Sequence, residues 1–152
     1  MQDFFKPYAV RAGILGGVVG IVVLLLSLIP LVGLCFALLA WLVYLGTGVF
    51  AVMQGKSQGA AMTIQQGAID GLVAGGIAGV MAHIVKFMAD IIVGAVVAVG
   101  FSSSAGDAAS GIVGSLIGNC LGLVFGIIFA IILGAVGGLI YAAIQQSQSK
   151  TA

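Results

Sequence analysis

No charged residue occurs between Arg11 and Lys56, and most residues in this stretch are apolar or glycine. The stretch is too long for one membrane-spanning helix, which needs about 20 residues, but it suits two helices joined by a tight turn. Over the whole chain 62% of residues are hydrophobic and 6% are charged. Soluble domains carry about 25% charged residues. We therefore expect an integral membrane protein.

Turn and loop residues divide the chain into four expected spans. The segment Ser27-Leu28-Ile29-Pro30 is the first break, because proline restricts the residue before it and ends helices. Polar loops are expected over 54–66 and 102–107, and a frayed tail over 145–152. The fold class predicted is an all-α polytopic membrane protein, with two antiparallel hairpins in a single membrane domain over 1–152. The four helices are expected at about 9–29, 31–53, 67–101 and 109–145.

The basic residues indicate how the chain is oriented in the membrane. With four spans, both termini and the 54–66 loop share one side of the bilayer. That side holds Lys6, Arg11, Lys56 and Lys150, whereas the opposite loops hold only Asp107. The positive-inside rule then places both termini in the cytoplasm, in a bacterial cytoplasmic membrane. The first span lacks a small-residue cleavage site, so we expect it to stay in the membrane.

Small residues recur every four positions along the third and fourth expected helices. Residues four apart share one helix face, so each run forms a groove in which another backbone can approach closely. In lipid such close packing is a main source of helix association. Glycine is also simply common in membrane helices, but eight consecutive small residues in register favour packing. The glycines expected to pack in this zipper are Gly67, Gly71, Gly75, Gly79, Gly94, Gly114, Gly118, Gly122, Gly126, Gly134 and Gly138.

Pairing the third and fourth helices about the 102–110 loop predicts a register. In that register small faces small along the whole length of the pair. The predicted pairs are Gly79 with Gly134, Gly75 with Gly138, Gly71 with Ala142, and Gly94 with Gly118.

The third expected helix is too long for the hydrocarbon layer of a bilayer. About 30 residues from Leu72 to Phe101 would span roughly 45 Å, whereas the apolar core is about 30 Å thick. Tilt, a kink at a glycine, or burial of one end by a partner would absorb the excess. The sequence leaves these three open.

His83, Lys86 and Asp90 form the one ionisable cluster inside a predicted span, and they share a helix face. Asn119 of the fourth helix would extend the same network. A charge at mid-bilayer costs about 2.5–3.5 kcal/mol, so these four residues are candidates for a polar path for protons or ions. One structural alternative is a local Lys86–Asp90 pair, with His83 bonded to the backbone or to Asn119. The other places the cluster near the outer headgroups, with Lys86 reaching toward them.

The remaining polar and sulfur-bearing residues indicate no reactive centre. Asp70 falls in the first turn of the third expected helix, where the helix dipole favours a carboxylate. Asp107 is expected in a loop or as the N-cap of the fourth helix. Cys35 and Cys120 lie in different spans and are expected to be buried small hydrophobes. We predict no catalytic residue, no metal and no cofactor, and the scattered basic residues make no nucleic-acid surface.

Residues 11–80 resemble an uncharacterised bacterial family of small glycine-rich four-helix integral membrane proteins. The resemblance rests on RAGILGGVVG, on the turn LIPLVGLC leading into LAWLVYLGTGVFAV, and on QQGAIDGLVAGGIAGV after a short basic loop. Members of that family often carry paired cysteines after the proline and an arginine-rich end to the second helix. Only Cys35 and Lys56 stand at these places here. The resemblance implies the four-helix topology and no particular activity.

The leading functional prediction is a non-enzymatic integral membrane protein that acts by helix packing. It would be a homo-oligomer or a small accessory subunit of a larger membrane complex. Its partners would be membrane lipid and either further copies of itself or other membrane-protein subunits. The alternative is a small oligomeric transporter or channel with a polar path at His83, Lys86 and Asp90.

Overall fold

The chain forms four α-helices in a computed structural model that describes residues 5–27, 29, 33–60, 63–101 and 105–149. The helices are α1 (Pro7–Leu26), α2 (Gly33–Ser57), α3 (Ile64–Phe101) and α4 (Ala105–Ser149). Each of the four is long and apolar enough to cross a membrane. The prediction of an all-α chain with four helices able to span a membrane is confirmed.

α2 runs past its expected end at residue 53 because its last turn is capped by the backbone. Gly59 adopts a left-handed conformation with a φ of +77°. The N–H of Gly59 then donates to Lys56 O at 2.9 Å, and the N–H of Ala60 donates to Gly55 O at 3.1 Å. This pair of bonds is the Schellman motif, which satisfies carbonyls that a helix end would leave unbonded.

α3 begins three residues before its expected start because Thr63 caps it. The Thr63 Oγ1 accepts a hydrogen bond from the N–H of Gln66 at 3.1 Å, which satisfies one of the free donors of the first turn. The polar loop expected over 54–66 is therefore confined to 58–63.

A frayed tail was expected from residue 145, but α4 continues to Ser149, so this expectation is wrong for residues 145–149. The side chain of Gln145 explains the order of this stretch. Its Oε1 accepts a hydrogen bond from Lys56 Nζ of α2, and its Nε2 donates to Tyr141 Oη at 3.1 Å. The rest of the tail, residues 150–152, lies outside the described residues, as do Leu28 and Pro30 of the predicted first break.

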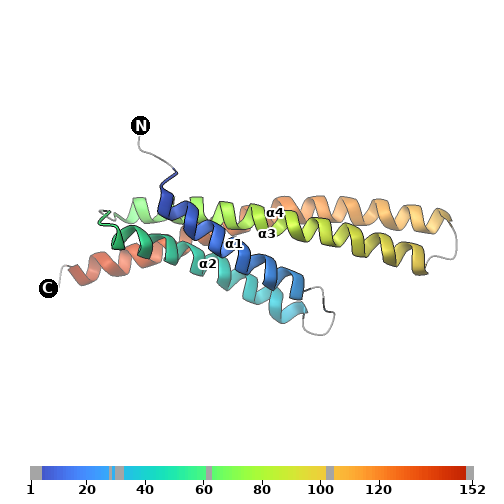
Figure 1. Cartoon of the computed structure of the whole chain (residues 1–152), viewed down its shortest axis with the longest axis horizontal. Helices are drawn as coiled ribbons and strands as arrows, with labels where there is room; N and C mark the ends of the chain where they lie inside the picture. The colour runs from blue at the N-terminus through green and yellow to red at the C-terminus, as the bar shows by residue number, and fades with distance from the viewer. Residues whose placement is uncertain (1–4, 28, 30–32, 61–62, 102–104, 150–152) are drawn as a thin grey trace.

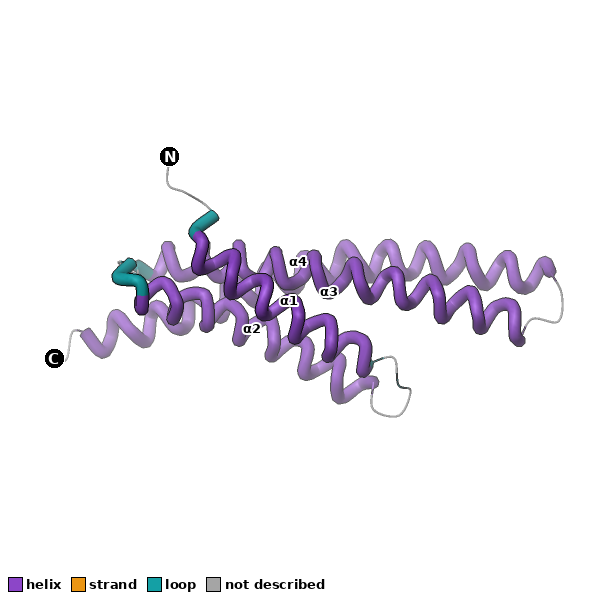
Figure 2. The backbone as a smooth tube through the Cα atoms, viewed as in Figure 1, coloured by secondary structure: helices purple, strands orange, loops and turns teal. Residues whose placement is uncertain are grey.

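α3 and α4 lie side by side, and α1 and α2 pack against them at one end (Figure 1). α1 begins and α4 ends at this same end, where the connection from α2 to α3 also lies (Figure 2). Toward the other end α1 and α2 lean away from α3 and α4, and the longer pair extends beyond them. We call this projecting part, residues 91–101 of α3 and 105–118 of α4, the distal segment.

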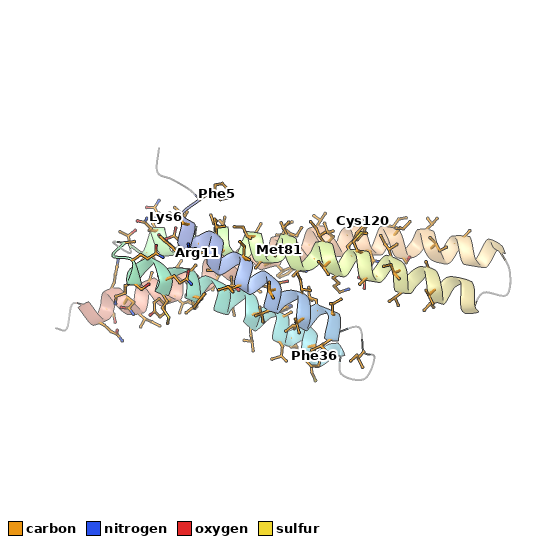
Figure 3. All side chains as sticks on the ribbon, in the orientation of Figure 1. Phe5, Lys6, Arg11, Phe36, Met81 and Cys120 are labelled. Carbon is orange, nitrogen blue, oxygen red and sulfur yellow. The ribbon has the colours of Figure 1, made fainter. Side chains whose placement is uncertain are left out.

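The interior of the four-helix part consists mainly of alanine and glycine. Among the described residues, the largest fully buried side chains are Val52 and Asp70. Large apolar side chains face outward instead, as Figure 3 shows, and Leu42 is 62% exposed. Small residues inside and large ones outside is the pattern expected when the surrounding solvent is lipid, because helices then associate through close packing.

Glycines of α3 lie in close contact with the backbone of α4. A Cβ added at Gly75 would lie 2.5 Å from Ala130 O and 2.9 Å from Gly134 Cα. A Cβ added at Gly71 would lie 3.1 Å from Gly138 Cα. No side chain fits at these positions, so the two backbones are in direct contact.

The register of these contacts differs from the predicted one by about one helical turn. Gly75 lies against Gly134 and Gly71 against Gly138, whereas the sequence paired Gly75 with Gly138. The connection between the helices is the reason. α4 begins at Ala105, four residues earlier than expected, so each pair moves by four residues, close to the 3.6 residues of one turn.

The expectation that small residues face each other along the whole pair is wrong in its distal part. A Cβ added at Gly114, Gly118 or Gly122 would meet no described atom within 4 Å. A Cβ at Gly94 would lie 3.4 Å from Ser115 Oγ, and Gly94 is not paired with Gly118. Gly114, Gly118 and Gly122 therefore do not lie at the contact between α3 and α4.

Sequence reasoning missed a second set of close contacts, which α1 makes with α3. A Cβ added at Gly13 would lie 2.9 Å from Ala74 O, and one added at Gly20 would lie 3.2 Å from Ala82 Cβ. The available signal was the same four-residue spacing, which relates Gly13 to Gly17 in the sequence. Small residues thus bring α1 as well as α4 against α3.

Asp70 joins α1 to α3 by its side chain, which is 1% exposed. The hydroxyl of Tyr8 donates to Asp70 Oδ2 at 2.7 Å, and Lys6 Nζ lies 3.6 Å from the same oxygen. The predicted role of Asp70 in the first turn is wrong, because α3 begins at Ile64 and Asp70 falls in its second turn, where the dipole effect is weak. Its carboxylate instead links two helices at the end of the molecule near the basic residues Lys6 and Arg11 (Figure 3).

Substituting a packed glycine and an open one tests the close contact between α3 and α4. Gly71→Leu should destabilise the folded protein by more than the about 1–3 kcal/mol of ordinary overpacking, because a backbone lies where the side chain would go. Gly118→Leu gains the same helix propensity and meets open space, so its free energy of unfolding should stay unchanged or rise by up to about 1 kcal/mol. Denaturation by dodecyl sulfate in mixed micelles, followed by circular dichroism, measures both. Equal effects would contradict the contact.

Candidate functional site

The structure brings all four predicted polar residues to one cavity. His83, Lys86 and Asp90 of α3 and Asn119 of α4 line a space of 140 Å³ where α1 leans away from the α3–α4 pair. Leu24 of α1 also lines it. Residues from α1, α3 and α4 therefore line the same cavity, so the cavity depends on how these three helices pack.

Lys86 and Asp90 form an ion pair one helical turn apart. Lys86 Nζ lies 2.5 Å from Asp90 Oδ2, and the two side chains are 30% and 16% exposed. The pairing is the first structural alternative that the sequence left open. Because each charge has its partner on the same helix, neither needs a counter-ion from a neighbouring helix.

His83 is oriented by the backbone of its own helix and by α2. Its Nδ1 donates to Gly79 O at 2.9 Å, and Tyr44 Oη lies 3.4 Å from the same nitrogen. The rings of Tyr44 and His83 are stacked, with centroids 5.9 Å apart. The far edge of the imidazole faces Gly126 of α4, where a Cβ would collide with it. Gly126, predicted to pack backbone against backbone, instead makes room for an imidazole.

A second cavity of 190 Å³ adjoins the first and shares Leu24, His83 and Lys86 with it. The further residues that line it are Ser27, Ala40, Trp41, Tyr44, Gly126, Phe129 and Leu133. Sequence reasoning missed this extension, because no spacing along the chain relates α2 to the third helix. The Ser27 hydroxyl, at the end of α1, donates to Leu24 O at 2.6 Å.

The two cavities lie at the level where α1 ends. α1 has 20 residues and is about 30 Å long at 1.5 Å per residue. That length equals the hydrocarbon thickness of a typical bilayer, about 30 Å. If α1 crosses the hydrocarbon, the cluster around Lys86 lies at the boundary with the headgroups, as in the second structural alternative, and not at mid-bilayer.

The two cysteines take no part in the cavities, and the prediction that they are buried is wrong. Cys35 and Cys120 are both exposed, and Figure 3 shows Cys120 on the outer side of α4. In a soluble protein a small apolar side chain is usually buried. Here the interior is filled by alanine and glycine, so the thiols lie on the outward faces.

Asp107 has its backbone in the first turn of α4, inside the helix and not in a loop, because α4 begins at Ala105.

Comparison with models of protein families, with characterised proteins and with solved structures finds no match to this chain. The resemblance to glycine-rich four-helix membrane proteins therefore stays a prediction.

The fit of His83 against Gly126 can be tested by a pair of substitutions. Gly126→Ala should push the ring away and break the bond to Gly79 O, which destabilises the protein by about 1 kcal/mol. In a His83→Ala background the same change should have no such effect, because the new methyl group meets open space. Thermal unfolding in detergent of the two single variants and the double variant measures the difference. Additive effects of the two substitutions would contradict the fit.

Proposed function

We propose that this chain is a non-enzymatic, multi-pass membrane protein that acts by helix packing, as a homo-oligomer or as a small subunit of a larger membrane complex. In this proposal α1–α2 and α3–α4 are two antiparallel hairpins held together by a glycine zipper. The observation that carries the proposal is the distal segment, an apolar pair of helices that α1 and α2 leave uncovered.

The lengths of the helices support a partner for the distal segment. α3 has 38 residues and α4 has 45, which correspond to about 57 Å and 68 Å. A bilayer with its headgroups is about 40–45 Å thick. Tilt, a kink at a glycine or burial of one end by a partner would accommodate the excess.

The surface of the distal segment also supports a partner. Its outward side chains are large and apolar, with Ile92 63% exposed, Val96 68% and Ile117 59%. Exposure of such an apolar patch to water is unfavourable, whereas its contact with another apolar helix or with lipid is favourable. The open glycines Gly114 and Gly118 continue the spacing that, nearer the termini, admits a second backbone at contact distance.

The distribution of charge supports a cytoplasmic location of both termini. Lys6 and Arg11 lie at the end of the molecule where α1 begins (Figure 3). Lys56, in the last turn of α2, donates to Gln145 near the end of α4. Lys86 is the one described basic side chain elsewhere, and it is paired with Asp90. By the positive-inside rule we propose that the basic end faces the cytoplasm of a bacterial cell.

The proposal predicts that Gly118→Leu disrupts assembly while leaving the fold of the single chain intact. The oligomer mass, measured by light scattering in mild detergent, should fall to that of one chain or lose a co-purifying subunit. Ile84→Leu, at an exposed apolar position of α3 that keeps its size, serves as the control. An unchanged assembly mass for Gly118→Leu would contradict the packing role of the distal segment.

The cavity at His83, Lys86, Asp90 and Asn119 favours a second candidate, a small transporter or channel. A polar cavity inside a set of membrane-spanning helices is a candidate path for ions or protons. This candidate predicts that Lys86→Met and Asp90→Asn each change proton or cation flux in liposomes without altering the assembly. Lys56→Met, outside the cavity, is the control. Unchanged flux in both cavity variants would remove this candidate.

A further inference from the structure

The two adjoining cavities form an amphipathic site at the level where α1 ends. Ser27, His83, Lys86 and Asp90 contribute polar groups to its lining. Apolar side chains complete the lining, among them Leu24, Phe87 and Leu123. A site with both kinds of surface fits a molecule that is itself amphipathic.

The depth of the site selects lipid as its ligand. The site lies where the 20 residues of α1 end, about one hydrocarbon thickness from Pro7. When α1 crosses the hydrocarbon, the phospholipid headgroups are concentrated at this level. An acyl chain attached to such a headgroup would continue toward the bilayer centre along the exposed apolar surface of the helices, which includes Ile84 and Phe129.

The charges of the site select the kind of headgroup. The charged side chains of its described lining are Lys86 and Asp90, which sum to zero. An anionic headgroup would be attracted by Lys86 but repelled by Asp90. A cationic headgroup would be attracted by Asp90 but repelled by Lys86. A headgroup with one phosphate and one ammonium satisfies both, because its phosphate can face Lys86 while its ammonium faces Asp90. The lysine, the phosphate, the ammonium and the aspartate then form a set of four charges of alternating sign, in place of the single Lys86–Asp90 pair.

We infer that this site binds a zwitterionic phospholipid with a primary ammonium, a phosphatidylethanolamine. The primary ammonium can donate hydrogen bonds to the Asp90 carboxylate, which the quaternary ammonium of phosphatidylcholine cannot do. Asn119 supplies a further amide to the same cavity. The side chains that receive the headgroup are already held in place, since His83 is bonded to Gly79 O and Lys86 to Asp90.

Native mass spectrometry of the intact protein in mild detergent tests this inference. The protein is mixed with phosphatidylethanolamine, phosphatidylcholine or phosphatidylglycerol of identical acyl chains. Phosphatidylethanolamine should bind about tenfold more tightly than the other two, the effect of one hydrogen bond to a charged group. Lys86→Met and Asp90→Asn should each abolish the preference, whereas Lys56→Met, at an exposed site on α2, should keep it.

A double variant guards against effects of an unpaired charge on folding. Lys86→Gln combined with Asp90→Asn removes both charges together and should also lose the preference. Equal or tighter binding of phosphatidylglycerol, or a preference unchanged in this double variant, would overturn the inference. Equal binding of free phosphoethanolamine would overturn the assignment to lipid. The same spectra report the mass of the assembly, so a failure here is separate from a failure of the proposed packing role.

Discussion

Direct contact between the backbones of α3 and α4 is the interaction on which the rest of the structure depends. In lipid, burial of apolar area contributes little favourable free energy to helix association, so close packing has to supply this free energy. The close packing involves Gly71 and Gly75 on α3, and Gly134 and Gly138 on α4. The same part of α4 also meets α2, because a Cβ added at Gly48 would lie 2.9 Å from Gly138 N. The α4 backbone is therefore held between two neighbours where its side chains are smallest.

The molecule opens where these contacts stop. Toward the distal end the interface between α3 and α4 changes from glycine against glycine to an imidazole that occupies the space beside Gly126. At the same level α1 ends and the two cavities begin. Lys86 lines both of them, and Asp90 lines the first. Beyond them the two long helices continue with their large apolar side chains exposed. A change in side-chain size along α3, from Gly79 to His83, thus separates a closed four-helix part from an open pair of helices.

Local chemistry explains which expectations held. Four apolar helices followed from hydrophobicity and from turn residues, and these properties act over a few neighbouring residues. The register was wrong by four residues because it depended on where α4 begins, which a short polar loop does not define. The exposed cysteines were misjudged because burial follows apolarity only when the solvent is water. Asp70 was assigned to its own helix, whereas its partners Tyr8 and Lys6 lie 62 and 64 residues away in sequence.

The amino-acid sequence by itself determined the four apolar helices and the faces on which small residues gather, because composition and four-residue spacing are local properties. It also placed Lys86 and Asp90 on one face of one helix, where they pair. Only the tertiary structure decided which glycines meet a neighbour and which remain open, and that Tyr44, Asn119 and Leu24 surround His83. The reason is that these contacts join helices far apart in the chain, and their register depends on the ends of every helix at once.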